Sequence, residues 1–283
     1  MKLALAGRDR KAPAMAETTA LSIPGSGGEI AARIYRPQSA TEVGPALVFF
    51  HGGGFVIGDL DGHDSFCRRL ADAAGVRLVA ATYRLAPEAP FPAQLDDAIT
   101  VARWVIASAV NLGIDPNRIA LGGDSAGGYL AVAATETLNR EPGTIAAQVL
   151  IYPLLQLDED VWASSVFRDS RAIGRLAVKY IRAQLSDIAV TIPSLLEVAA
   201  GGAPPTIIAA GGMLDPTRPD ARAYAERLSR SGGTVIFREY EPLMHGFGNL
   251  AHTSPAARAA LAEIGELAGA MLRGSAPTSP PPV

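Results

Sequence analysis

The fold is decided by the stretch Arg118-Ile119-Ala120-Leu121-Gly122-Gly123-Asp124-Ser125-Ala126-Gly127, in which an apolar run leads directly into Gly-x-Ser-x-Gly. A helix-forming run follows at residues 128–134. Strand, tight turn and helix in this order predict a nucleophile elbow, a strained turn that exposes the hydroxyl of its serine. Glycines are expected on both sides of Ser125 because a side chain there would collide with the neighbouring strand or helix. Taken alone, the pentapeptide also fits a chance surface loop.

Strand-like and helix-like segments alternate along the rest of the chain. Apolar segments typical of strands lie at 45–50, 76–83, 148–152, 206–210 and 234–237, and segments typical of helices at 64–74, 94–109, 126–139, 220–231 and 256–272. The strands are nearly continuous in apolar residues, as expected when a parallel sheet is buried on both faces. Two runs at 20–23 and 30–35 around a glycine-rich segment predict an antiparallel hairpin. The order predicts an α/β fold with one mostly parallel sheet.

Length and composition favour one domain over residues 1–283. The net charge of −3, without a basic run, gives no reason to expect a nucleic-acid partner. The sequence shows neither a convincing signal peptide nor an apolar segment that could span a bilayer, so we expect no stable membrane anchoring. Cys67 is the single cysteine, and a reducing cytoplasm is the expected location. The Ser/Pro-rich tail at about 275–283 is expected to be disordered.

A second motif, His51-Gly52-Gly53-Gly54, follows the predicted strand at 45–50. Successive glycines let the backbone approach a substrate closely and direct N–H groups at one point. We expect the N–H groups of Gly53 and Gly54 to form an oxyanion hole together with that of Ala126, the residue after the nucleophile. His51 is predicted to brace the loop with a hydrogen bond. A flexible glycine-rich loop is the alternative interpretation.

The combined motifs resemble the hormone-sensitive-lipase-like branch of bacterial carboxylesterases, over nearly the whole chain from about residue 23. The residues that carry the resemblance are His51-Gly52-Gly53-Gly54-Phe55-Val56-Ile57-Gly58, His63-Asp64, Tyr83-Arg84-Leu85-Ala86-Pro87-Glu88, Phe91-Pro92, Gly123-Asp124-Ser125-Ala126-Gly127-Gly128, Tyr152-Pro153, Asp215-Pro216 and His245-Gly246-Phe247. This resemblance implies the α/β-hydrolase fold, with an eight-stranded sheet and helices on both faces. It also implies hydrolysis of short-acyl carboxylic esters without a cofactor or metal.

The order along the chain assigns the remaining catalytic residues. In this fold the serine is followed by an acid and then by a histidine, each at the carboxyl end of a strand. Asp215 follows the strand at 206–210, and His245 follows the strand that begins at 234. Asp220 is the rival acid, but it falls where a helix begins and is expected in its first turn. His252 is expected at the surface.

The remaining histidine and the elbow acid are assigned supporting roles. His63 precedes a predicted helix, and the resemblance makes it a structural partner. Asp124 is expected to tie its carboxylate to neighbouring backbone, and with His51 and Gly52 it forms the predicted supporting set around the site.

Several features depart from the family. Only about twenty residues precede the first predicted strand, so we expect a reduced cap, supplied mainly by an insertion at about 155–201, and a more open site. The acidic residue that usually stands four positions after the triad acid is Pro219 here.

Other functions stay open at this point. The same residues serve amidases, thioesterases and peptidases, and a scaffold of this kind also serves as a non-catalytic ligand-binding module. The presence of His245 argues against the binding module. A homodimer through the terminal helix and the last strand, as in some relatives, is neither required nor excluded by the sequence.

Overall fold

The computed structural model describes residues 9, 11–139, 144–157, 183–184, 192–196 and 202–275. Most of the predicted cap insertion at about 155–201 lies outside these residues. The predicted tail, apart from Ser275, lies outside them too.

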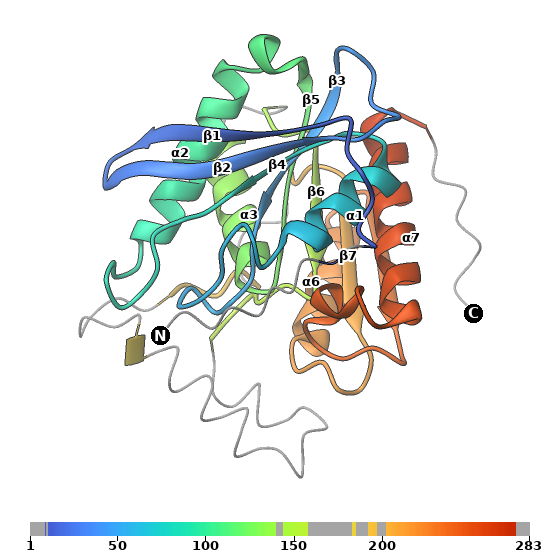
Figure 1. The fold of residues 1–283 in the computed structure, drawn as a ribbon. Coiled ribbons are helices and arrows are strands. Elements are labelled where there is room, and N and C mark those ends of the chain that lie inside the picture. Colours follow the sequence, from blue (N-terminus) through green and yellow to red (C-terminus); the bar gives the residue numbers. More distant parts are fainter. Residues whose placement is uncertain are drawn as a thin grey trace.

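The centre of the molecule is an eight-stranded sheet (Figure 1). Its strands are β1 (Glu17–Gly25), β2 (Gly28–Arg36), β3 (Gly44–Phe50), β4 (Arg77–Ala81), β5 (Ile114–Asp124), β6 (Ala147–Ile151), β7 (Thr206–Gly211) and β8 (Val235–Tyr240). They lie in the order β1-β2-β4-β3-β5-β6-β7-β8. β1 pairs antiparallel with β2, and β2 with β4, while the pairs from β4 to β8 are parallel. The predicted hairpin and mostly parallel sheet are confirmed.

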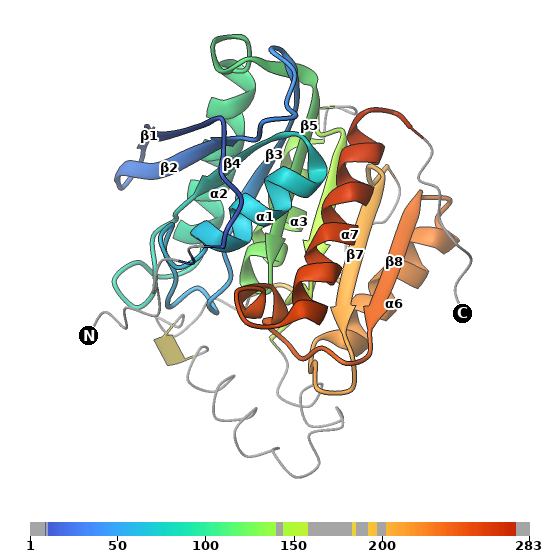
Figure 2. The ribbon, with the colours of Figure 1, turned by 45° about the vertical axis from the view of Figure 1, so that its right-hand side comes forward.

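Helices cover both faces of this sheet. They are α1 (Asp64–Ala74), α2 (Ala93–Ala107), α3 (Ala126–Leu138), α6 (Arg218–Arg230) and α7 (Pro255–Leu272), with short 3₁₀ turns η1 (Val110–Leu112) and η2 (Phe247–Leu250). Figure 2 shows α1 and α7 in front of the sheet and α6 behind it. None of the described helices combines the length and the apolar composition that crossing a lipid bilayer requires.

The strands are apolar along their length because both of their faces are covered. On β3, Ala46, Val48 and Phe50 join the core beneath α2, α3 and α6. The intervening Leu47 and Phe49 join the core beneath α1 and α7. All of β3 is buried. This two-sided burial explains why the strand segments lack the alternation of a half-exposed sheet.

Most element boundaries differ from the sequence prediction by a few residues, and two of these differences lie near the site. β4 ends at Ala81 rather than at Tyr83, so Tyr83 and Arg84 stand on the loop beyond the sheet. α6 begins at Arg218, two residues earlier than predicted, with Pro219 inside its first turn. Proline is compatible with the start of a helix because the N–H groups there have no helical partner. Asp220 lies in that first turn, as predicted.

Glycines set the close approach of α7 to α1. A Cβ at Gly269 would collide with the carbonyl of Ala74, the last residue of α1, and a Cβ at Gly265 would lie 2.6 Å from the Cβ of Ala73. The Arg273 guanidinium donates to the same Ala74 carbonyl at 2.8 Å. The two helices therefore pack backbone against backbone where these glycines stand.

We predict that Gly269→Val lowers the free energy of unfolding by about 1–3 kcal/mol, because the larger residue forces α1 and α7 apart. Urea unfolding followed by circular dichroism measures the loss. Glu266→Val on the exposed face of α7 is the matched control and should change stability by about 0.5 kcal/mol or less. Equal losses in the two variants would show that the close packing of the helices is not the cause.

Candidate active site

Ser125 stands at the turn between β5 and α3 in a strained conformation, with φ 51° and ψ −116°. Such a conformation costs a non-glycine residue about 1–3 kcal/mol and persists only when the surroundings enforce it. Here the Ser125 N–H donates to the carbonyl of Ile151 at 3.0 Å, and its carbonyl accepts from the N–H groups of Leu154 and Gly128, each at 2.9 Å. Contacts from both β6 and α3 thus hold the turn.

The glycines around Ser125 are required because neighbouring atoms lie too close for a side chain. A Cβ at Gly123 would collide with the backbone of Gly127, and a Cβ at Gly127 would collide with the carbonyl oxygen of Phe50 at the end of β3. Gly128 lies against Pro153, where an added Cβ would be 2.8 Å from the proline ring. The N-terminus of α3 can therefore sit directly against the sheet, beneath the Ser125 hydroxyl.

A histidine and a carboxylate complete a hydrogen-bonded line with this hydroxyl. Asp215 Oδ1 lies 2.9 Å from His245 Nδ1, and His245 Nε2 lies 2.9 Å from Ser125 Oγ. A carboxylate can only accept, so Nδ1 carries the proton and Nε2 is free to accept from the serine. The three residues come from the carboxyl ends of β7, β8 and β5, which meet at one edge of the sheet.

The Asp215 carboxylate is buried, with 2% of the residue exposed, and it is well supplied with donors. Oδ2 accepts from the N–H of Gly211 at 2.7 Å, and Oδ1 accepts from the N–H of Thr217 at 3.0 Å and from its hydroxyl at 2.8 Å. Burial raises the pKa of Asp215, but the hydrogen bond and charge of His245, together with these donors, outweigh burial and lower the pKa below 3.8. Asp215 is therefore ionised at neutral pH.

The loop after β3 carries the predicted oxyanion donors. Gly53 and Gly54 have φ of 119° and 62°, and the carbonyl of Gly53 accepts from the N–H groups of Val56 and Ile57. A side chain at Gly53 would collide with the carbonyl of Ile57, so the tight turn requires glycine. Within the described part of the chain, the N–H groups of Gly53, Gly54 and Ala126 have no acceptor. They are available to a substrate oxygen.

A buried polar cluster supports this loop from below. Asp124 accepts from the N–H of Gly52 at 2.7 Å and pairs with His63 Nε2 at 3.3 Å. His51 Nδ1 donates to the carbonyl of Gly52 at 2.7 Å, and its ring stacks on Tyr83 with centroids 4.4 Å apart. The Tyr83 hydroxyl donates to the His51 carbonyl. These contacts brace the glycine loop against the elbow.

Within this cluster, Asp124 and His63 form the charged pair. Burial raises the pKa of Asp124, but the charge and hydrogen bonding of His63 and the Gly52 N–H outweigh it, so that the pKa is lowered. Burial lowers the pKa of His63, and Asp124 outweighs that effect and raises it. Burial and the neighbouring His63 lower the pKa of His51 to about 4. His51 is therefore neutral when Asp124 and His63 are ionised.

Two residues at the site had no assigned role in the sequence prediction. The Thr217 hydroxyl touches both Asp215 and His245. The ring of Tyr152, at φ 37°, meets the His245 ring edge-to-face with centroids 5.0 Å apart. In the sequence, the only signal for Tyr152 was its Tyr-Pro pair with Pro153. Thr217 was marked only by its position near the predicted acid, Asp215. His252, in contrast, is exposed, and Asp220 accepts from Gln156 rather than reaching His245.

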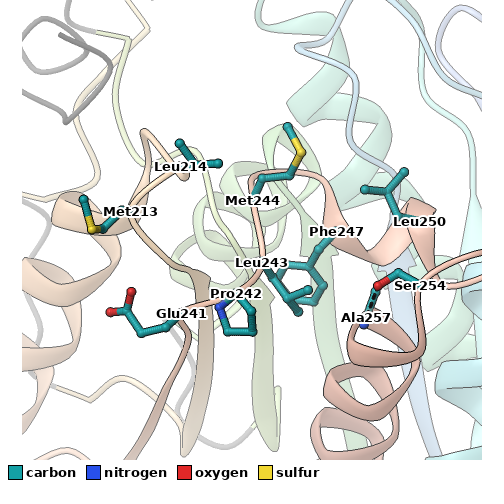
Figure 3. Close-up of a pocket in the computed structure, with 10 residues that line it drawn as sticks. All are labelled: Met213, Leu214, Glu241, Pro242, Leu243, Met244, Phe247, Leu250, Ser254 and Ala257. Atoms are coloured by element: carbon teal, nitrogen blue, oxygen red, sulfur yellow. Dashed lines mark hydrogen bonds between the residues drawn. The ribbon is translucent and has the colours of Figure 1, made fainter. Parts of the chain in front are cut away.

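The loops of Asp215 and His245 also present apolar side chains to solvent. Met213 and Leu214 precede Asp215 and are about half exposed, as is Met244 before His245. With Leu250 they lie along one side of an apolar pocket (Figure 3). Its lining residues are Met213, Leu214, Glu241, Pro242, Leu243, Met244, Phe247, Leu250, Ser254 and Ala257. The loops that carry Asp215 and His245 therefore share an exposed apolar surface.

Comparison with known proteins identifies the family of this chain. A family model described as the α/β-hydrolase fold matches residues 47–249. The chain is 37% identical to the carboxylic ester hydrolase LipN of Mycobacterium tuberculosis, over a region that covers 83% of this chain and 65% of LipN. It is 34% identical to an ethyl acetate hydrolase of Pseudomonas putida, over 78% of this chain and 72% of that protein.

A solved structure shows the same architecture. The crystal structure of EstE1, a thermostable carboxylesterase from a metagenomic library, superposes with a TM-score of 0.82 at 33% identity, covering 92% of this chain and 90% of EstE1. The chain belongs to the α/β-hydrolase fold family, in the hormone-sensitive-lipase-like branch that comprises carboxylic ester hydrolases.

We predict that Asp124→Asn lowers the free energy of unfolding by about 3 kcal/mol, because His63 is left as a buried charge without its partner. The raised pKa of His63 contributes stability that is fully present below its ordinary value of 6.5 and lost as the pH rises through the raised value. The lowered pKa of Asp124 contributes stability present above 3.8 and lost as the pH falls through the lowered value. The difference from wild type should therefore be largest between pH 3.8 and 6.5.

Guanidinium unfolding at several pH values measures this difference. Asp115→Asn, which removes a half-exposed ion pair with Arg118, is the matched control and should cost about 0.5 kcal/mol or less. A loss at Asp124 that is the same at every pH would contradict the assignment of the buried ion pair.

Proposed function

We propose that the chain hydrolyses short-acyl carboxylic esters through an acyl-enzyme, with Ser125 as nucleophile, His245 as base and Asp215 as the acid that orients it. The observation that carries the proposal is the line of two 2.9 Å hydrogen bonds from Asp215 through His245 to the Ser125 hydroxyl. A nucleophile, a base within hydrogen-bond reach and a third group that orients the base are the parts that acyl transfer requires.

In the first half of the reaction, Ser125 Oγ attacks the ester carbonyl carbon while His245 Nε2 takes its proton. The carbonyl oxygen becomes an oxyanion that accepts from the N–H groups of Gly53, Gly54 and Ala126. His245 then gives the proton to the departing alcohol, and the acyl group stays on Ser125. Asp215 stabilises the charged imidazole during both transfers.

In the second half, water takes the place of the alcohol. His245 removes a proton from the water as its oxygen attacks the acyl carbon. Collapse of the second oxyanion breaks the bond to Ser125 Oγ, which recovers its proton from His245, and the carboxylic acid leaves. The histidine ends each half in the neutral form in which it began.

A small ester is the proposed substrate. The printed name of one relative, ethyl acetate hydrolase, supports a short acyl chain and a short alcohol. Met213, Leu214 and Met244 expose apolar side chains on the loops that carry Asp215 and His245, which supports an uncharged ester as substrate. The net charge of −3 and the lone, buried Cys67 support a cytoplasmic protein without nucleic-acid partners. The edge strand β8 and helix α7 are the surfaces we propose for any homodimer.

We predict that Ser125→Ala lowers turnover of p-nitrophenyl acetate by on the order of a million-fold, because the catalytic residues act as a unit and the oxyanion donors alone give little rate. A fluorophosphonate probe should label wild type at Ser125 and leave the variant unlabelled. Ser231→Ala, at the exposed end of α6, is the control and should keep wild-type turnover. Substantial turnover by Ser125→Ala would refute the assigned nucleophile.

We predict that kcat/KM is largest for esters with short acyl chains. A series of p-nitrophenyl esters from about two to sixteen acyl carbons should give its largest kcat/KM at the short end, and p-nitroacetanilide should be turned over more slowly than the acetate ester. A maximum at long chains would indicate a lipase, and faster hydrolysis of the anilide would indicate an amidase.

A further inference from the structure

The hydroxyl of Thr217 lies among three polar groups at the acid end of the proposed catalytic line. Thr217 Oγ1 is 2.8 Å from Asp215 Oδ1, 3.2 Å from the carbonyl oxygen of Tyr152 and 3.4 Å from His245 Nδ1. The residue is 1% exposed, so solvent does not compete for these contacts. One hydroxyl therefore contacts both the acid and the base.

The hydroxyl has one proton and two acceptors for it. When the proton points to Asp215, the carboxylate oxygen that binds His245 carries a second side-chain donor. When it points to the carbonyl of Tyr152, an oxygen lone pair of Thr217 faces the N–H of His245 instead. In the first arrangement the hydroxyl draws charge from Oδ1, and in the second it shares the histidine proton with Oδ1. The first arrangement weakens the hold of Asp215 on that proton, whereas the second adds an acceptor that favours the charged imidazole. The shorter donor distance, 2.8 Å to Oδ1 against 3.2 Å to the Tyr152 carbonyl, favours the first arrangement.

The position of this hydroxyl is fixed from several sides. The Thr217 N–H donates to Asp215 Oδ1, and the residue immediately precedes α6. The Tyr152 carbonyl belongs to a residue at φ 37° whose own N–H donates to Ala209 on β7. A side chain held by the acid loop and the end of β6 together is placed to act on the hydrogen bond between Asp215 and His245.

We propose that Thr217 is a positioning residue that sets the strength of the Asp215–His245 hydrogen bond. The proposal rests on the proposed function, because it assumes that this pair serves Ser125. Thr217 touches no reacting atom and acts only through the acid and the base. Its removal makes Oδ1 a stronger acceptor, and the pair then keeps its proton to a higher pH.

The expected signature is therefore a shift of the acidic limb of the pH–rate profile toward higher pH. Around the pair, the described elements carry several other titratable groups. They include Asp124 at the end of β5, Tyr152 after β6, Arg218, Asp220 and Arg222 on α6, and Glu239, Tyr240 and Glu241 at the end of β8. A substitution at Thr217 leaves all of these groups in place. A shift of the acidic limb can therefore be attributed to loss of the Thr217 hydroxyl.

The experiment compares wild type with Thr217→Val, which keeps the shape and loses the hydroxyl, and with Thr217→Ser, which keeps the hydroxyl. The rate of Ser125 labelling by a fluorophosphonate and kcat/KM for p-nitrophenyl acetate are measured from about pH 4 to 9. We expect Thr217→Val to move the acidic limb upward by roughly 0.5–1 pH unit with KM unchanged, and Thr217→Ser to restore the wild-type limb. If Thr217→Val does not fold, as judged by circular dichroism, Thr217→Ala should show the same upward shift.

Three results would overturn the inference: an unshifted limb in Thr217→Val, a downward shift, or equal shifts in Thr217→Val and Thr217→Ser. In each case, labelling of wild type at Ser125 shows that the proposed function stands without it. A wild-type chain that is not labelled and does not hydrolyse esters would refute the proposed function and this inference together.

Discussion

The close approach of α3 to β3 is the constraint on which the site depends. It exists because Gly127 has no side chain where the carbonyl of Phe50 lies, and because Gly123 has none where Gly127 turns. Any Cβ at these positions would push the helix away from the sheet. With the helix in place, Ser125 is forced into its strained turn, and the Ala126 N–H comes to the same edge as Gly53 and Gly54. The geometry of the proposed nucleophile, Ser125, and that of the proposed oxyanion donors therefore have one cause.

Two buried carboxylates near this turn, Asp124 and Asp215, have similar hydrogen-bonding environments. Each accepts a backbone N–H, from Gly52 or Gly211, and each faces a histidine. In both, the opposing histidine and the N–H donors outweigh the cost of burial, and the pKa of the carboxyl is lowered. The difference lies in the partner of each histidine. His63 is enclosed beneath the glycine loop, whereas His245 turns its second nitrogen to Ser125.

Sequence patterns predicted the parts of this arrangement that depend on local chemistry. Gly123, Ser125 and Gly127 could be recognised because a strained turn admits few residue types. Asp215 and His245 could be placed because each follows a strand, and parallel strands end at one edge. Thr217 and Tyr152 gave no such signal, since a hydroxyl or a ring acquires its role only through contacts between separate loops. The end of β4 at Ala81 was missed because Thr82 and Tyr83 are β-formers. β4 ends before them, although Thr82 still donates to the Ala31 carbonyl of β2.

The loop that carries Asp215 is held in place although position 219 is a proline rather than an acidic residue. Asp215 receives its support from the backbone of Gly211 and Thr217, from the Thr217 hydroxyl and from His245, none of which needs a carboxylate at 219. Arg218, beside the proline, pairs with Glu239 at 3.3 Å and with Glu241 at 3.2 Å, both near the start of the His245 loop. The pairs are partly exposed, so they add little to overall stability. They do join the loop of Asp215 to the loop of His245, and because Pro219 fixes the first turn of α6, Arg218 reaches across from a rigid helix end.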